Sequence, residues 1–274
     1  MTSTSRDETG PQTERWLHLD GAVNVRDVGG LPLRGGGRTR ARRLLRADNL
    51  QALSRPDVQT LRDVVGVRDV VDLRTSSERT IEGPGPLDDE PGIRIQHLSL
   101  LPEAGDEVRE VDGDLLMPWQ QPGPDAVPAP RMASRSVYVS YLQDRPHSLV
   151  AALQTVAHSD GAVVVHCAAG KDRTGVVVAL ALDLAGAERE AILDDYLLTA
   201  ERLDAILHRL SNSRAYASNL RERSRESHLP RAQAIQDVLD AVDGAGGAER
   251  WLSGHGWQPD DSAALRARLT SPDD

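Results

Sequence analysis

The sole cysteine and the sole lysine of the chain lie four residues apart, in the stretch His166–Gly175 (HCAAGKDRTG). Cys167 precedes Arg173 by six positions. Of the 32 lysine and arginine residues in the chain, all except Lys171 are arginines. Two residues that occur once each, placed together in a short Gly-containing loop with an arginine, are poorly explained by chance. We therefore take Cys167, Lys171 and Arg173 as candidates for chemistry on an anion.

A thiol, a guanidinium and a tight loop before a helix suit nucleophilic attack on a phosphate monoester. A thiolate is stabilised at a helix N-terminus beside cations, so we expect Cys167 to be the nucleophile. Arg173 would hold two phosphate oxygens bidentately. Backbone N–H groups and the helix dipole would bind the remaining charge. The predicted phosphate-binding residues are Ala168, Ala169, Gly170, Lys171, Asp172, Arg173 and Thr174.

The leaving oxygen needs a proton, and the sequence offers several carboxylic acids. Asp172 is the first candidate, because a bound phosphate dianion favours its protonated form, although its two cationic neighbours favour the ionised form. Asp72 is the second, because it ends a predicted strand and strand carboxyl ends face the ligand crevice of an open α/β sheet. Four acids at 101–130 are further candidates that are better interpreted as solvated surface groups: Glu103, Asp106, Asp112 and Asp114.

Simpler interpretations exist for these residues. A lone cysteine is more often a buried structural residue, and Lys171 could be a solvated surface lysine. His166 suits an orienting role through hydrogen bonds better than a general base. Arg26 and Asp27, close to paired glycines, favour an internal ion pair that braces the loop over direct catalysis. The spacing of Arg173, Thr174 and Gly175 from Cys167 nevertheless favours a catalytic role for Cys167.

Other loop classes fit the sequence less well. A Walker motif is excluded because Val165 stands where its first glycine is required and Asp172 stands where Ser or Thr is required. The strongest enzymatic alternative is a rhodanese-like sulfurtransferase, whose loop is usually shorter and lacks the Arg-Thr-Gly ending. A pseudophosphatase that binds phosphorylated partners without turnover is the non-enzymatic alternative, and the intact Cys167 and Arg173 argue against it.

The pattern Cys167-x5-Arg173-Thr174-Gly175 resembles the protein tyrosine phosphatase superfamily, and the whole loop resembles that of the secreted mycobacterial tyrosine phosphatases and related bacterial tyrosine/lipid phosphatases. Segments similar to that family also stand at Asn24–Gly30, Val71–Arg74 and Ile192–Thr199. The resemblance implies a phosphocysteine intermediate and activity toward phosphotyrosine, phosphoserine/threonine and phosphoinositides. It also implies that Lys171 and Asp172 act as in phosphoinositide phosphatases, and that a helical lid at 101–130 or 214–242 covers the site.

The elements on each side of the loop are those that this chemistry needs. Residues 161–166 form a short apolar run that predicts a buried central strand, and 174–184 predict a core helix. Residues 67–73 and 93–98 predict further strands. Ser54 predicts the N-cap of a helix that Gly66 ends. We therefore predict an α/β fold with a mostly parallel central sheet flanked by helices and a helical C-terminal part.

Composition limits the partners. The chain has 274 residues, so we predict a flexible arm at 1–15 and one phosphatase domain at 16–274 with a long loop or flap at about 101–130. The formal net charge of −10 disfavours nucleic acid as a partner, and no run approaches the ~20 apolar residues of a membrane span.

The lone cysteine excludes an internal disulfide. We expect no metal or cofactor, and a cytoplasmic protein, with signal-less secretion left open.

Overall fold

The computed structural model describes residues 15–101, 103, 109–111, 114–116, 135–217, 220 and 224–271. The predicted N-terminal arm, except for Arg15, lies outside the described residues, as does most of the predicted flap. Two of the flap acids, Asp106 and Asp112, are among the residues outside. Within the flap, β6 (Arg109–Val111) and β7 (Asp114–Leu116) pair as antiparallel strands.

A five-stranded sheet organises the molecule, with the strand order β1-β3-β8-β4-β5. Four neighbouring strands run parallel, and β1 alone pairs antiparallel to β3. This arrangement confirms the predicted mostly parallel sheet. The strands are β1 (Arg26–Asp27), β3 (Leu44–Ala47), β8 (Ala162–His166), β4 (Val67–Asp72) and β5 (Arg94–His97).

The carboxyl ends of the four parallel strands meet at one level. His166 at the end of β8 pairs with Ala47 on one side and with Asp72 on the other, and Asp72 pairs with His97. The loop that follows His166 therefore starts in the middle of the sheet edge where ligands bind in open α/β folds.

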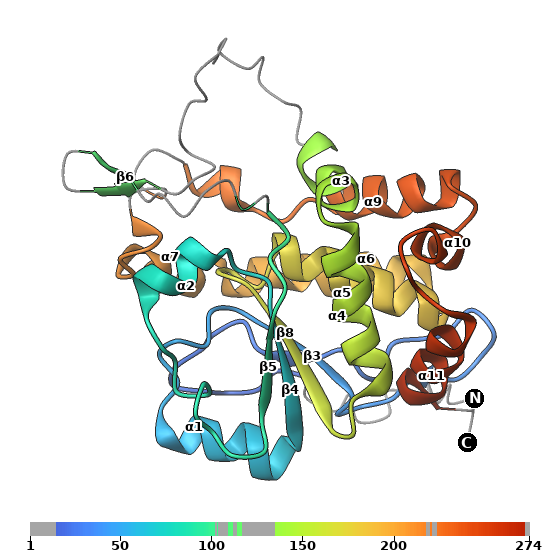
Figure 1. Ribbon diagram of the computed structural model, residues 1–274, viewed down its shortest axis with the longest axis horizontal. Helices are drawn as coiled ribbons and strands as arrows, with labels where there is room; N and C mark the ends of the chain where they lie inside the picture. The colour runs from blue at the N-terminus through green and yellow to red at the C-terminus, as the bar shows by residue number, and fades with distance from the viewer. Residues whose placement is uncertain are drawn as a thin grey trace, which may run out of the picture.

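Helices cover both faces of this sheet (Figure 1). The fully buried strand β8 alternates between two cores: Val163 and Val165 belong to the larger one, and Val164 belongs to the smaller one with Val58 and Leu61. The larger core includes α4 (Pro146–His158) and α5 (Asp172–Ala185), and the smaller one includes α1 (Arg55–Gln59). Burial on two sides explains why β8 reads as a continuous apolar run.

The helix predicted after Ser54 is present and begins with a capping box. The Ser54 hydroxyl accepts a hydrogen bond from the Asp57 amide, and the Asp57 carboxylate accepts one from the Ser54 amide. The helix α1 continues as a π-helical turn, η1 (Thr60–Val65), and ends at Gly66 with φ +83°. Both predicted boundaries are confirmed.

The remaining chain is largely helical, as predicted, but more interrupted. Pro146 is the first residue of α4 and separates this helix from α3 (Arg135–Asp144). Residues 189–211 form two helices separated by a 3-10 turn, and α2 (Ser76–Glu82) was not predicted. The remaining elements are α6 (Arg189–Leu197), η3 (Leu198–Arg202), α7 (Leu203–Ser211), η4 (Arg225–His228), α9 (Ala232–Gly244), α10 (Ala248–Ser253), α11 (Pro259–Leu269) and the pair β2 (Arg38–Thr39) with β9 (Thr270–Ser271). Within the described ranges, no helix combines the length and the hydropathy needed to cross a bilayer.

Candidate active site

The loop between β8 and α5 turns sharply at Gly170, which has φ +65°. An ideal Cβ on Gly170 would lie 2.4 Å from the carbonyl oxygen of Ala47 at the end of β3. Both the backbone conformation and the close approach therefore require glycine at this position.

The loop carbonyls are bound from outside the loop. The Ala168 carbonyl accepts a hydrogen bond from the Asn49 amide at 2.9 Å. The Ala169 carbonyl accepts from Asn24 Nδ2 at 2.9 Å, and the Gly170 carbonyl accepts from Arg46 Nη2 at 2.8 Å. Because the N–H and C=O of a peptide point in opposite directions, fixing the carbonyls outward turns the amides toward the inside of the loop, as an anion cradle needs.

Cys167 and Thr174 lie at the two ends of this cradle and are both buried. Cys167 is 2% exposed and stands at the end of β8, ahead of the first turn of α5. Thr174 is fully buried in that turn, and its hydroxyl has no hydrogen-bond partner among the described residues. A buried hydroxyl of this kind has a donor to spare for a group that enters the cradle.

Arg173 is held by a carboxylate that the sequence analysis missed. Its Nη1 and Nη2 donate to the two oxygens of Glu78 at 2.6 and 2.8 Å, and Nη1 also donates to the Leu73 carbonyl at 3.2 Å. Burial raises the pKa of Glu78, but the charge and hydrogen bonds of Arg173 outweigh burial and lower that pKa. Glu78 therefore stays ionised and fixes the plane of the guanidinium. The pattern Thr75-x-x-Glu78 is a capping box that could have revealed both α2 and this residue.

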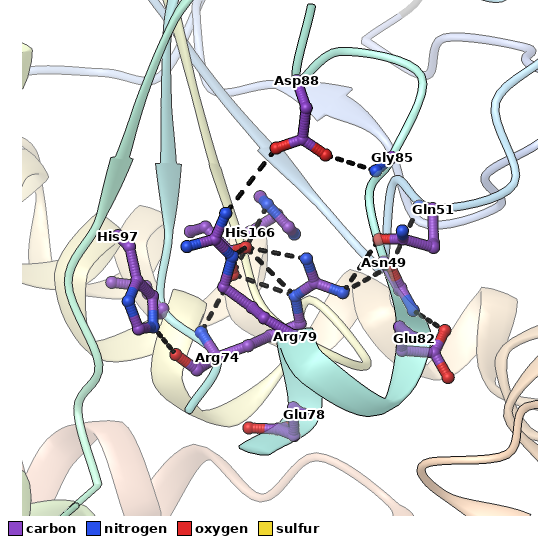
Figure 2. Close-up of polar contacts among 12 residues, drawn as sticks. Asn49, Gln51, Arg74, Glu78, Arg79, Glu82, Gly85, Asp88, His97 and His166 are labelled. Carbon is purple, nitrogen blue, oxygen red and sulfur yellow. Dashed lines mark hydrogen bonds and ion pairs between the residues drawn. The ribbon is translucent and has the colours of Figure 1, made fainter. Parts of the chain in front are cut away.

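Asp72 lies at the level of His166 and is surrounded by the side chains of Arg74, Arg79 and His166. The Arg74 guanidinium donates to both of its oxygens, at 2.9 Å to Oδ1 and 2.7 Å to Oδ2. Arg79 Nε and His166 Nε2 lie 3.4 and 3.7 Å from its carboxylate. Figure 2 shows Arg74, Arg79 and His166 gathered at this point, with Arg74 continuing to Asn49 and Gln51.

This environment keeps Asp72 charged. Burial raises the pKa of Asp72, yet His166, which becomes protonated in the acidic range where Asp72 titrates, and the charge and hydrogen bonds of Arg74 hold that pKa well below its ordinary value. Burial lowers the pKa of His166 to about 4, so the imidazole is neutral at pH 7. An ionised Asp72 that already binds Arg74 through both oxygens is suited to bracing the loop rather than to donating a proton.

Asp172 and Lys171 lie together at the start of α5. Asp172 Oδ1 accepts a hydrogen bond from the Tyr138 hydroxyl and lies 3.5 Å from Lys171 Nζ. The Asp172 side chain is 38% exposed, in contrast to the 2% of Asp72. Lys171 Nζ donates to the His228 carbonyl at 2.7 Å. Of the two preferred acids, Asp172 is therefore the one that a substrate can reach.

Behind the loop, Asp195 joins several arginines. Arg26 Nε and Arg46 Nη1 lie 3.2 and 2.8 Å from its carboxylate oxygens, and Arg15 also pairs with it. Although burial raises the pKa of Asp195, these three guanidiniums outweigh burial and lower it. The predicted ion pair between Arg26 and Asp27 is wrong: Arg26 turns to Asp195, whereas Asp27 accepts the backbone amides of Gly29 and Arg42. Arg26 and Asp27 are successive residues of β1, and successive side chains of a strand point to opposite faces of the sheet. The two side chains therefore find different partners.

A small apolar cluster packs against the loop. It consists of Ile206, Leu210, Ala215 and Tyr216, with Ala168 and Ala169 of the loop packed against it. Glu82 at the end of α2 accepts hydrogen bonds from the Ser213 hydroxyl at 2.5 Å and from the Ala215 amide at 3.3 Å. The segment after α7 is thus attached to α2, the helix whose Glu78 binds the Arg173 guanidinium.

The structure brings most of the predicted site residues together. Cys167, Lys171, Asp172 and Arg173 share one loop, and Asp72 supports that loop from the adjacent strand. Of the flap acids, Glu103 accepts the Ser76 amide at 2.9 Å at the start of α2, and Asp114 lies in β7. Among the described residues there is no group of three or more His, Cys, Asp or Glu side chains arranged to hold a metal ion.

Comparisons with known proteins agree with this site. The family model described as the tyrosine phosphatase family matches residues 17–271. The chain is 32% identical over 213 residues to the triple specificity protein phosphatase PtpB of Mycobacterium tuberculosis, covering 70% of this chain and 72% of that protein. It is 32% identical over 141 residues to a tyrosine-protein phosphatase of Nostoc commune, covering 51% of this chain and 42% of that protein.

Among solved structures, P. aeruginosa TpbA in complex with phosphotyrosine matches with a TM-score of 0.36 and 13% identity, covering 82% of this chain and 98% of that one. That likeness is remote, whereas the family model spans nearly the whole chain. The chain belongs to the tyrosine phosphatase family and is a protein-tyrosine phosphatase.

Proposed function

We propose that the enzyme hydrolyses phosphotyrosine through a phosphocysteine formed on Cys167. The observation that carries this proposal is the placement of Arg173. Its guanidinium is fixed by Glu78 through two hydrogen bonds, on a loop that begins at the buried Cys167 and whose carbonyls are bound outward. A fixed guanidinium and inward amides bind a phosphoryl group and the charge that develops on it during in-line transfer.

The reaction runs in two balanced steps. In the first, the Cys167 thiolate forms a bond to phosphorus while the bond from phosphorus to the tyrosine oxygen breaks, and Asp172 gives its proton to that oxygen. In the second, Asp172 takes a proton from a water molecule that attacks phosphorus, and the sulfur leaves as a thiolate. The Thr174 hydroxyl donates a hydrogen bond to the departing sulfur.

Asp172 is the proposed general acid and Asp72 a supporting residue. Asp172 lies in the loop with its side chain 38% exposed, and its neighbour Lys171 can approach the same phosphate. Asp72 is enclosed by Arg74 and His166 and stays ionised. A bound phosphate dianion favours protonation of a carboxyl group close to it, which fits a residue inside the loop.

We propose that phosphoserine/threonine and phosphoinositides are also substrates. The relative PtpB is named a triple specificity phosphatase, which supports a broad range. Lys171 supplies a second cation beside Arg173 that would meet a second phosphate on an inositol ring. A reduced thiol is required throughout, so we propose that the enzyme works in a reducing compartment such as the cytoplasm, and that residues 16–274 act as one phosphatase domain.

The test compares Cys167→Ser, Asp172→Asn and Asp72→Asn with the unchanged protein on p-nitrophenyl phosphate. We expect Cys167→Ser to lose all turnover while phosphotyrosine binding persists, and the unchanged protein to show a phosphocysteine after rapid acid quenching. Turnover of thiosulfate with cyanide instead of aryl phosphate would contradict the proposal. A panel of phosphotyrosine peptide, phosphothreonine peptide and singly phosphorylated inositides then measures the substrate range.

A further inference from the structure

The carboxylate of Asp172 is held by tyrosines that come from other parts of the chain. Tyr138 in α3 donates its hydroxyl hydrogen to Asp172 Oδ1, and the Tyr138 and Tyr196 hydroxyl oxygens are 2.9 Å apart. The two rings meet edge to face, with centroids 6.4 Å apart. Figure 1 shows α3 beside α9, and α3 also contacts α5.

The direction of this chain of hydrogen bonds follows from counting protons. A tyrosine hydroxyl has one hydrogen, and Tyr138 gives its hydrogen to Asp172. Tyr196 must therefore be the donor in its bond with Tyr138. Burial, and next the negative charge of Asp172, raise the pKa of Tyr138 far above its ordinary value, so it remains a donor at every working pH. The pair can orient a proton on Asp172 but does not supply one.

An independent observation shows that the loop sequence accommodates Tyr196. An ideal Cβ on Gly175 would lie 3.0 Å from Cδ2 of the Tyr196 ring, which is closer than side chains normally pack. Glycine at this position lets Tyr196, which is 2% exposed, lie against the first turn of α5. Because Asp172 and Gly175 are three residues apart, they share one face of this turn, and the Tyr196 ring from α6 packs against that face.

Two polar contacts between the Asp172 side chain and other described residues fall on the same oxygen. The Tyr138 hydroxyl donates to Oδ1, and Lys171 Nζ lies 3.5 Å from the same oxygen. A carboxyl group held at one oxygen can rotate less, so its other oxygen keeps a defined direction.

We propose that Tyr138, supported by Tyr196, is the positioning residue of the general acid, and that it holds Oδ1 of Asp172 so that Oδ2 carries the proton to the leaving oxygen. This inference rests on the proposed role of Asp172. The proton moves from Oδ2 to the tyrosine oxygen of the substrate as its bond to phosphorus breaks, and the Tyr138 hydrogen bond stabilises the carboxylate that results.

The experiment uses the full chain and aryl phosphates whose leaving groups differ in basicity, from p-nitrophenyl phosphate to phenyl phosphate. A general acid matters most when the leaving group is poor. We expect Asp172→Asn to lose about 100-fold or more in kcat on phenyl phosphate and much less on p-nitrophenyl phosphate. Tyr138→Phe should show the same pattern with a loss of about tenfold on phenyl phosphate, and Tyr196→Phe a smaller loss of the same kind.

Two controls separate positioning from a general structural effect. Tyr141→Phe removes a hydroxyl from the same helix, at a ring 6.0 Å from that of Tyr138, and should leave the dependence on leaving group unchanged. Inhibition by inorganic phosphate reports binding to the cradle alone, and its inhibition constant should be the same in Tyr138→Phe and in the unchanged protein. If Tyr138→Phe unfolds on purification, as seen by circular dichroism, Tyr196→Phe becomes the deciding variant.

The outcomes distinguish this inference from the proposed function. If the loss of kcat depends steeply on the leaving group in Asp172→Asn but not in Tyr138→Phe or Tyr196→Phe, the positioning role is overturned and Asp172 remains the acid. No dependence in Asp172→Asn would remove Asp172 from that role and the inference with it, while loss of turnover in Cys167→Ser would still support the phosphocysteine reaction. A loss in Tyr138→Phe that is equal for all leaving groups would also contradict the proposal.

Discussion

At the scale of single residues, the position of Arg173 depends on Glu78. The Glu78 side chain is completely buried, and the pair is therefore unlike the exposed Arg266–Glu249 pair, whose side chains are 50% and 45% exposed. Removing one member of a buried pair leaves the other charge without compensation, whereas exposed pairs contribute little.

Glu78→Gln should therefore lower the free energy of unfolding by about 3–5 kcal/mol, measured by urea denaturation at pH 7. The same variant should raise KM for p-nitrophenyl phosphate, because Arg173 loses one of its two anchored hydrogen bonds. Glu249→Gln is the matched control and should change stability by less than about 1 kcal/mol. Equal stability and KM in Glu78→Gln and the unchanged protein would show that Arg173 is positioned by something else.

At the scale of elements, the strand, loop and helix around Cys167 could be predicted because their signals are local. The apolar run before His166 and the helix after Lys171 lie next to the loop in sequence. The capping box of Thr75 and Glu78 could have revealed α2, but the contacts of Glu78 and Tyr138 with the loop could not be assigned in this way, because these residues lie 95 and 34 positions from the loop residues that they contact. Asp72 lies beside His166 at the end of β4, but its partner Arg74 determines its charge, and the choice of partner depends on packing.

The shape of the loop between β8 and α5 depends on Gly170. Gly170→Ala adds a Cβ that would lie 2.4 Å from the Ala47 carbonyl oxygen, so the loop and the end of β3 must separate. We expect kcat/KM for p-nitrophenyl phosphate to fall by about 100-fold or more, because misplacing the cradle by about 1 Å has an effect of this size.

Gly66→Ala is the control for Gly170→Ala. Gly66 also has a positive φ, +83°, but no atom lies within 4 Å of an ideal Cβ there. The Gly66→Ala substitution should therefore lower the free energy of unfolding by about 1 kcal/mol through backbone strain alone and leave kcat/KM unchanged. Normal activity in Gly170→Ala would mean that the loop tolerates the displacement and that its amides do not bind the phosphate.

At the scale of the whole molecule, buried titratable groups make stability depend on pH. Asp72, Glu78 and Asp195 have lowered pKa values in the folded protein. Their stabilisation is complete above the unfolded pKa of about 4 and is lost as the pH falls through the lower folded values. Asp27 and Asp48 have pKa values raised by burial, so they oppose folding at neutral pH and this effect diminishes on acidification.

His166 acts in a separate and higher pH window. Its pKa falls from 6.5 to about 4 on folding because burial disfavours the charged imidazole. The unfolded chain therefore binds a proton between pH 6.5 and 4 that the folded protein does not bind, and stability falls as the pH is lowered through this range. A shift of this size corresponds to a loss on the order of 3 kcal/mol by pH 4.

Urea denaturation of the unchanged protein at several pH values between 7 and 4.5 should show this decline, and His166→Gln should show much less of it. His147→Gln is the matched control, because His147 is exposed and its removal should leave the decline intact. The carboxylates with lowered pKa values contribute mainly below this window, and the raised pKa values of Asp27 and Asp48 affect both variants alike, so the difference between the two histidine variants isolates His166. A decline of the same steepness in His166→Gln would show that the imidazole is charged in the folded protein, and that the polar cluster behind the loop holds a cation beside Asp72 rather than a neutral ring.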